Sequence, residues 1–307
     1  MREGSTTSHP QQTMRLRLTH RNRARSGTGR ITAALVPLLL LTAAVAAQGP
    51  TQLKPGFNLF TRQQDVQLGQ ELAAKIRKHS TMVDDPTLTA YVNAIGRRLA
   101  ASREARESGF TFTFEVVADP KINAYALPGG PMFINTGLLK AVDNEAQLAG
   151  AMAHEMSHVI LRHGTNQASK ANMIQLPLAL AAQMTDNGSL MGELAQLGIN
   201  LGASSVLLKF TRTDESQADL MATHLMAEAG YDPIQLARFF NKLNAQDNVG
   251  ALVFLSDHPN PDNRSRAIRQ EAARLPQQTY GYQTGQFQRM KRAVANIKEP
   301  PPKPKTS

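Results

Sequence analysis

Apolar side chains recur every three or four positions in two stretches that follow the first 60 residues. This spacing predicts amphipathic helices over residues 61–79 and 86–102, and Pro86 suits the first turn of the second helix. Residues 110–117 instead alternate between apolar and polar positions, which is typical of a half-buried strand. Two helices are therefore expected to precede the first strand.

Two further short strands are predicted soon after the first one. Residues 122–127 and 132–135 are mainly apolar, and Pro128-Gly129-Gly130 between them is typical of a tight turn. We therefore expect a sheet of about three strands with helical segments on both sides of it in the sequence. The predicted fold class is α+β and mainly α-helical.

A long helix is predicted after the sheet, from Asp143 as its N-cap to Gly164 as its terminator. Glu145 in the first turn and Arg162 and His163 in the last turn would complement the helix dipole. The helix is apolar on nearly every side, so we expect it to be buried beside the sheet.

The second half of the chain is also expected to be helical. Residues 172–208 are apolar with helical spacing, but polar side chains interrupt them, so they do not read as a membrane span. A further helix is predicted over residues 213–230, and residues 231–233 are expected to begin the next one.

The first 47 residues have the composition of an export signal. A basic region ends at Arg30 and is followed by the apolar residues 31–46, several small side chains and the polar Gln48. The apolar run is shorter than the ~20 residues that a membrane helix needs. We expect residues 1–47 to direct the rest of the chain to the periplasm or the medium, and an uncleaved membrane anchor is the alternative.

The positive charge of the chain is concentrated at its two ends. The chain has a net charge of +10 from 34 basic and 24 acidic residues. Without residues 1–47, which hold seven arginines and one glutamate, 27 basic and 23 acidic residues remain. No basic stripe with interleaved aromatic residues is present, which argues against a nucleic-acid partner. The basic, proline-containing residues 276–307 are interpreted as a solvated end.

The predicted buried helix carries a motif for metal chemistry. The chain has no cysteine, so a metal must be bound by nitrogen and oxygen. His154 and His158 are four residues apart, and both imidazoles can therefore reach one cation. Glu155 lies about 100° around the helix from His154, beside the cation, where it can take a proton from water and pass it to a leaving amine.

A catalytic zinc site usually has three protein ligands and one open position. The chain has a glycine where the metzincin arrangement requires a third histidine, and His163 is nearly opposite His154 on the helix wheel. A carboxylate from a second helix is the other solution, the gluzincin arrangement. Glu215 and Asp219 are four residues apart, so Glu215 can ligate the metal while Asp219 accepts the ring N–H of a ligating histidine.

One more histidine is a candidate for the site. His258 lies in the sequence Asp257-His258-Pro259-Asn260-Pro261, six residues before Arg264. Placed over the metal, His258 could stabilise an oxyanion, and Arg264 could hold it or add positive charge. Alternatively, His258 could fill the open metal position and keep the enzyme latent.

Taken together, these motifs resemble the zinc metallopeptidases of the CAAX prenyl protease and HtpX-like family, the forty-eighth metallopeptidase family. The resemblance extends from about Gln63 to Arg269. It is carried by the following blocks: residues 123–139, His154-Glu-Met-Ser-His158, Glu215-Ser-Gln-Ala-Asp219, and His258-Pro259 with Arg264.

The resemblance implies roles for individual residues. It implies one zinc ion per chain on His154, His158 and Glu215, with Glu155 as the catalytic glutamate. It also places His258 and Arg264 near the transition state or over the metal. Its strand that binds extended polypeptide substrates by β-addition corresponds to residues Asn123, Ala124, Tyr125 and Ala126.

The sequence departs from parts of this family, because the membrane spans of its integral-membrane members and the helical-repeat domain of a periplasmic member are not found here. What remains is similar to a compact exported branch that acts in envelope protein quality control, with the outer-membrane assembly machinery as a partner. The expected organisation is a signal over 1–47, a zinc metalloendopeptidase domain over 48–275 and a tail over 276–307. The alternatives are a chaperone-like protein that rarely cleaves and a structural protein whose metal has four protein ligands.

Overall fold

The computed structural model describes most of the part of the chain that follows the predicted signal. The described residues are 49–173, 189–196, 210–245, 254, 256, 258–259, 263–281 and 285–300. All of them belong to one compact unit, residues 47–307. The predicted signal and most of the apolar residues 172–208 lie outside the described residues, apart from 172–173 and 189–196.

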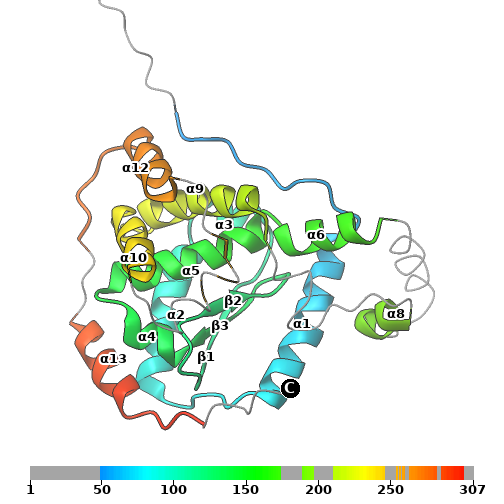
Figure 1. Cartoon of the computed structure of the whole chain (residues 1–307), viewed down its shortest axis with the longest axis horizontal. Coiled ribbons are helices and arrows are strands. Elements are labelled where there is room, and N and C mark those ends of the chain that lie inside the picture. The colour runs from blue at the N-terminus through cyan, green and yellow to red at the C-terminus, as the bar shows by residue number, and fades with distance from the viewer. Residues whose placement is uncertain are drawn as a thin grey trace, which may run out of the picture. The chain divides into compact units, whose positions relative to one another are not determined.

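Figure 1 shows a small sheet surrounded by helices, which confirms the predicted α+β, mainly helical class. The elements are α1 (Arg62–His79), α2 (Pro86–Ala100), α3 (Arg103–Glu107), β1 (Thr113–Val117), β2 (Ala124–Ala126), β3 (Pro131–Asn135), α4 (Thr136–Ala141), α5 (Glu145–Ile160), α6 (His163–Ala171), α8 (Leu190–Gln196), α9 (Arg212–Glu228), α10 (Ile234–Asn244), α12 (Arg264–Arg274) and α13 (Gln286–Ala295). None of these described helices is long and apolar enough to cross a membrane.

The sheet is mixed, with the strand order β1-β3-β2. β1 is parallel to β3, and β2 is antiparallel to β3 with Tyr125 opposite Phe133. The turn between β2 and β3 contains Gly129 and Gly130, both at positive φ. A Cβ on Gly130 would lie 2.2 Å from the carbonyl oxygen of Thr111, so the turn requires glycine for both conformation and space.

β2 leaves one set of its main-chain groups free of the sheet. The N–H of Asn135 donates to the carbonyl of Asn123, and the N–H of Leu127 donates to the carbonyl of Pro131. In a strand, the N–H and C=O groups of successive residues point alternately toward one neighbouring strand and then the other. Since those of Asn123 and Leu127 point toward β3, the N–H and C=O groups of Ala124 and Ala126 point away from it. That free edge of β2 packs beside α5.

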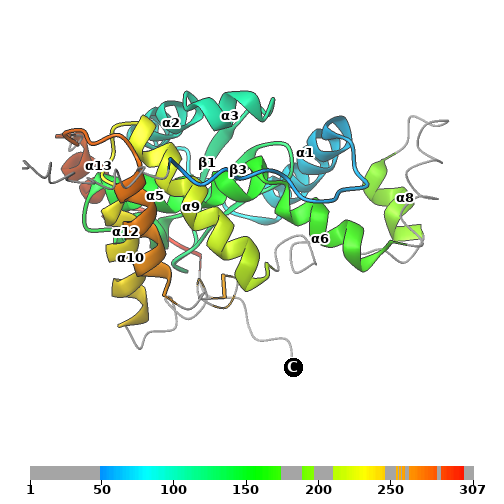
Figure 2. The same ribbon diagram turned by 90° about the horizontal axis from the view of Figure 1, so that it is seen from above.

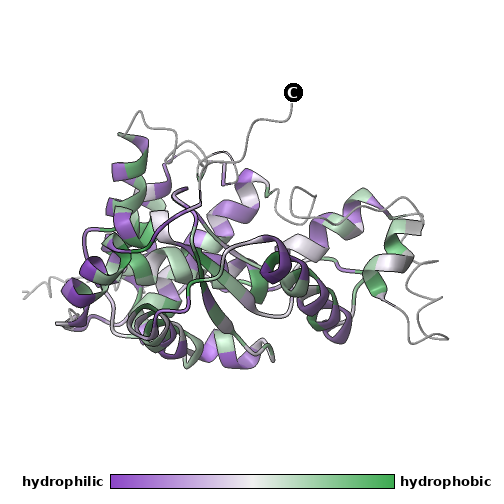
Figure 3. Cartoon of the chain, turned by 90° about the horizontal axis from the view of Figure 1, so that it is seen from below, coloured by the Kyte–Doolittle hydropathy of each residue, from purple (hydrophilic) through white to green (hydrophobic). Residues whose placement is uncertain are grey.

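Helix α5 is the centre of the fold, and every one of its residues is buried. It packs against α9, α10, α2 and β2, and the apolar colouring of Figure 3 is concentrated on the sheet and the central helices. Its N-cap is Asn144, which accepts a hydrogen bond from the N–H of Gln147, one residue after the predicted cap Asp143.

The predicted C-terminus of this helix is wrong. The helix ends at Ile160, and Arg162 has a left-handed conformation with φ 57°. The Arg162 side chain donates to Asp65 on α1 at 2.5 Å and to the carbonyl of Phe60 at 2.6 Å. These tertiary contacts compensate for the unfavourable backbone conformation, so the chain turns and His163 begins α6 instead of ending α5.

The helices of the second half agree with the sequence pattern more closely. Thr211 and Asp214 form a capping box at the start of α9, which covers the predicted residues 213–230 to within two residues at each end. Figure 2 shows α12 beside both α9 and α10, in agreement with its direct packing against each of them.

The predicted solvated end contains a packed helix. Phe287, Met290 and Val294 of α13 are buried, and α13 packs against α2 and α4. The apolar side chains of α13 recur with helical spacing, and their burial outweighs the basic composition that suggested a solvated end. The boundaries 48–275 and 276–307 stay a prediction.

The contact between α1 and the β2–β3 turn provides a test of the packing. A Cβ on Gly69 of α1 would lie 1.8 Å from the carbonyl oxygen of Pro128. We expect Gly69→Ala to lower the free energy of unfolding by about 1–3 kcal/mol, because the helix must move away from the turn. Urea denaturation measures this change.

Gly192→Ala in α8 is the matched control, because its nearest neighbour would be an ordinary contact at 3.6 Å with Ser189. Alanine is the better helix former by about 1 kcal/mol, so this variant is expected to be neutral or slightly stabilising. Equal effects of the two substitutions would contradict the described contact between α1 and the turn.

Candidate metal centre and active site

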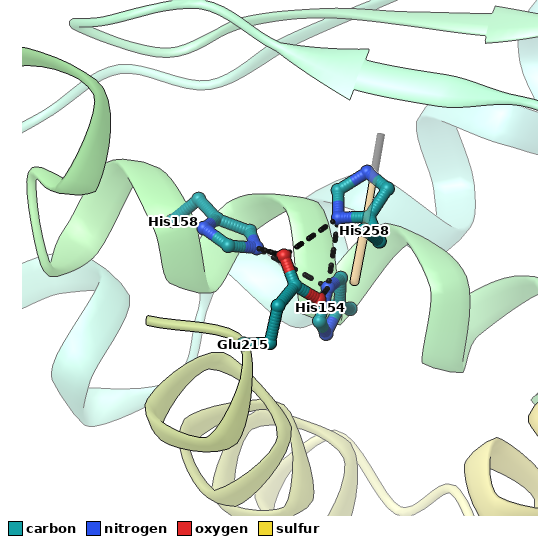
Figure 4. Close-up of side chains that lie close together, drawn as sticks. All are labelled: His154, His158, Glu215 and His258. Atoms are coloured by element: carbon teal, nitrogen blue, oxygen red, sulfur yellow. Dashed lines mark hydrogen bonds and ion pairs between the residues drawn. The ribbon is translucent and has the colours of Figure 1, made fainter. Parts of the chain in front are cut away.

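Four buried side chains from three parts of the chain converge on one point. α5 places His154 and His158 on one face, α9 brings Glu215 to them, and His258 comes from the segment between α10 and α12 (Figure 4). One ligand atom from each of the four lies within 4.8 Å of all the others. The structure thus brings together the three predicted metal ligands and the predicted loop histidine.

The spacing of these atoms fits a shared cation. His154 Nε2 lies 3.2 Å from His158 Nε2 and 3.3 Å from His258 Nδ1. The Glu215 oxygens lie 3.0–3.4 Å from the same three nitrogens. Zinc–nitrogen bonds of about 2.1 Å at tetrahedral angles would place neighbouring ligand atoms about 3.4 Å apart. Two imidazole nitrogens this close to each other repel through their lone pairs unless a cation or a proton lies between them.

The charge states of Glu215 and His158 favour metal binding. Burial opposes ionisation of Glu215, but His258 and His154 outweigh it and lower the pKa of this carboxyl far below its usual range. Burial lowers the pKa of His158 well below 6.5. Glu215 is therefore an anion, and His158 is a neutral imidazole with a free lone pair, which are the forms that can bind a metal.

His154 and His258 attract positive charge. Burial would lower the pKa of His154, but the charge of Glu215 and the contact with Asp219 outweigh burial and raise the pKa to about 9. The pKa of His258 is also raised, because Glu155 and Glu215 outweigh its burial. A bound metal must displace these protons, so metal binding is expected to release protons.

Asp219 and Arg264 contact members of the cluster from outside it. Asp219 Oδ1 lies 3.1 Å from His154 Nδ1, which is the position predicted for it. Arg264 donates to both Asp219 oxygens, at 2.7 and 3.0 Å, and to Glu215 at 2.9 Å. Its guanidinium also lies 3.6 Å from the ring centre of Phe240. Arg264 therefore orients the carboxylates of Glu215 and Asp219, and no described contact joins it to His258.

Glu155 lies beside the donor cluster and not among its members. Burial raises the pKa of this carboxyl, while His258, with Nε2 3.2 Å from Glu155 Oε1, and His154 oppose the rise. The carboxylate also accepts a hydrogen bond from the backbone N–H of Ala126. The free edge of β2 and the candidate proton acceptor are therefore in direct contact.

Two side chains that the sequence analysis did not assign hold the outer side of His158. His163 Nδ1 lies 3.0 Å from His158 Nδ1, and Phe210 stacks on the His158 ring with the centroids 3.7 Å apart. A helix that continued to Gly164, as the sequence predicts, would place His163 nearly opposite His154. Only the turn at Arg162 brings it to His158, and no motif in the sequence marks that turn.

The Arg264 contacts provide a test of the site. Replacing Arg264 with leucine leaves the carboxylates of Glu215 and Asp219 buried without their cation. We expect Arg264→Leu to lower the free energy of unfolding of the metal-free protein by about 3–5 kcal/mol, measured by urea denaturation.

Arg77→Leu is the control, because Arg77 also pairs with a carboxylate, that of Glu115, but its side chain is 46% exposed. The exposed pair is expected to contribute about 1 kcal/mol or less. If Arg264→Leu cost no more than Arg77→Leu, the buried network would not have the role described here.

The comparisons with known proteins agree with this geometry. The family model described as peptidase family M48 matches residues 86–272. The chain is 30% identical over 224 residues to the beta-barrel assembly-enhancing protease of Escherichia coli K12, a match that covers 69% of this chain and 44% of that protein. It is 28% identical over 284 residues to the beta-barrel assembly-enhancing protease of Yersinia pestis, covering 84% of this chain and 57% of that protein.

A mitochondrial relative also matches the chain. The chain is 32% identical over 184 residues to the mitochondrial metalloendopeptidase OMA1 of Schizosaccharomyces pombe, covering 59% of this chain and 52% of that protein. The chain thus spans about half the length of these relatives. The matched residues 86–272 include the two α5 histidines, the α9 carboxylates and the loop histidine. The chain therefore belongs to peptidase family M48.

Proposed function

We propose that the protein is a zinc-dependent metalloendopeptidase that hydrolyses extended segments of polypeptides. The observation that carries this proposal is the buried cluster of His154, His158, Glu215 and His258, with the Glu155 carboxylate next to it. Nitrogen and carboxylate donors in a four-coordinate arrangement are typical of zinc. Family membership supports the peptidase activity.

The residues of the cluster have distinct proposed roles. His154, His158 and Glu215 hold the metal, and Asp219 and Arg264 keep these ligands in place. Zinc, when bound, supplies a Lewis acid that polarises the scissile carbonyl and makes water more acidic. Glu155 takes a proton from that water and transfers it to the leaving amine, a role that its burial and raised pKa support.

The free edge of β2 is the proposed place for the substrate. The main-chain groups of Ala124 and Ala126 point away from β3, so an extended peptide could add to the sheet there. Ala126 also contacts Glu155, so a peptide on this edge would pass beside the proton acceptor. Main-chain pairing selects for an extended conformation and little for sequence, which suits unfolded or misassembled polypeptides.

His258 has two proposed states. In this structure His258 Nδ1 is the fourth donor of the cluster, and Nε2 lies 3.2 Å from Glu155. If the four residues held a metal together, His258 would have to move out of the cluster to admit substrate, and it could then stabilise the oxyanion. The four-donor arrangement also favours a second candidate function, a structural metal site whose fourth ligand never leaves.

The proposed location and partners follow the matched relatives and the leader sequence. Two relatives are named for enhancing β-barrel assembly, and residues 1–47 have the pattern of an export signal. We infer that the protein acts on envelope proteins outside the cytoplasm, in association with outer-membrane assembly. A chaperone-like protein that binds the same segments with little cleavage is the alternative.

The role of Glu155 gives the main test. Glu155→Gln keeps the shape of the side chain but removes the proton acceptor, so peptidase activity should fall at least about 100-fold, while the zinc content is unchanged. Cleavage of casein by the zinc-loaded protein measures the activity, and metal analysis measures the zinc. Treatment of the wild-type protein with a chelator should abolish the same cleavage.

Glu115→Gln is the control, because it replaces a carboxylate on β1 that pairs with Arg77. Its activity should match that of the wild type. A fully active Glu155→Gln protein would reject the proposed mechanism. An inactive wild-type protein that binds zinc and prevents client aggregation would favour the chaperone-like alternative.

A further inference from the structure

One buried histidine contacts the metal site without being a member of it. His163 begins α6, and its side chain is almost fully buried. Its Nδ1 lies 3.0 Å from Nδ1 of His158, and its Nε2 lies 3.1 Å from Oε1 of Gln217 on α9. Asp214 Oδ1, at 3.9 Å from the same Nε2, is too distant for a hydrogen bond. The side chains of His158, His163 and Gln217 form one continuous chain.

Only one arrangement of protons along this chain is compatible with metal binding. If Nε2 of His158 is to ligate a metal, its lone pair must be free, so the ring proton is on Nδ1. That N–H then donates to Nδ1 of His163, which must be the acceptor. His163 therefore carries its own proton on Nε2 and donates it to the side-chain carbonyl of Gln217.

We propose that His163 and Gln217 are positioning residues for the ligand His158, fixing its tautomer and the orientation of its ring. This proposal depends on the metal site proposed above. Phe210 stacks on the face of the His158 ring, but stacking does not distinguish the ring from its flipped form. The contact with His163 distinguishes the two ring orientations. It requires that Nδ1 of His158 faces α6, so Nε2 of His158 faces Glu215.

The two α5 ligands are thus supported in chemically different ways. Nδ1 of His154 faces the carboxylate of Asp219, whereas Nδ1 of His158 faces a neutral imidazole that ends on a neutral amide. Both supports lead to α9, which carries Gln217 and Asp219 as well as the ligand Glu215. A neutral support orients His158 without adding another carboxylate to Glu155, Glu215 and Asp219 in the buried site, where each unpaired charge is costly.

The test measures zinc affinity by competition with a chromogenic chelator. His163→Leu leaves the ring N–H of His158 buried without an acceptor, and zinc affinity should fall about 10–100-fold. His163→Asn places an amide oxygen near the position of the lost Nδ1, so it should recover most of the affinity. Gln217→Leu should also weaken zinc binding. Because Gln217 is only half-buried, this substitution leaves the buried core unchanged.

Gln167→Leu is the matched control. Gln167 lies one turn after His163 on α6 and donates to Asp214 of α9 at 2.6 Å, so its loss removes an α6–α9 hydrogen bond without touching the chain of three residues. Its zinc affinity should stay within about threefold of the wild-type value. The visible spectrum of the cobalt-substituted proteins provides a second readout, because a misoriented His158 changes the ligand field of the metal.

The outcomes separate this inference from the proposed function. Unchanged zinc affinity in His163→Leu and Gln217→Leu would overturn it, and so would an equal loss in Gln167→Leu, which would indicate general loosening between α6 and α9. A wild-type protein without tight zinc binding would overturn the metal site and this inference together. A wild-type protein that binds zinc but cleaves nothing would overturn the proposed peptidase function alone, and the affinity series would still decide the role of His163.

Discussion

The whole site depends on a carboxylate buried where α5 and α9 pack together. Glu215 is fully buried, and a carboxylate without water around it is stable only when positive charge or hydrogen-bond donors surround it. Arg264 supplies one such partner, and the imidazoles of His154, His158 and His258 face the other side of the same group. A cation at the centre satisfies all of these groups at once, which links metal binding to the packing of the two helices.

Helix α9 has a larger part in this arrangement than the ligand count suggests. Within five residues it provides Glu215, Gln217 and Asp219, which contact the three clustered histidines, His163 and His154 respectively. The capping box at Thr211 begins the helix one turn before Glu215. It therefore also fixes where along the helix axis these side chains meet α5. The rest of the fold holds α5 and α9 at this separation.

The sheet contributes to the site through one edge only. Both edges of β3 are hydrogen-bonded, one to β1 and the other to β2. The outward main-chain groups of Ala124 and Ala126 in β2 instead face α5. Since the N–H of Ala126 already donates to Glu155, a peptide that pairs with this edge would meet the proton acceptor directly. This contact connects the proposed substrate position with the proposed chemistry.

Local patterns in the sequence determined the fold class and the boundaries of α1, α2 and α9 to within two residues, because periodicity and caps are local properties of helices. The spacing of His154 and His158, and of Glu215 and Asp219, marked two candidate pairs, but only the tertiary structure brings these pairs and His258 together. Helices α3, α4, α6, α12 and α13 were not predicted from the sequence. The end of α5, the packing of α13 and the position of His163 were decided only by tertiary contacts. Arg162 adopts a left-handed conformation because Asp65, nearly one hundred residues earlier, pairs with it. Such a partner is not visible in the local sequence, and therefore the turn that brings His163 to His158 was not visible either.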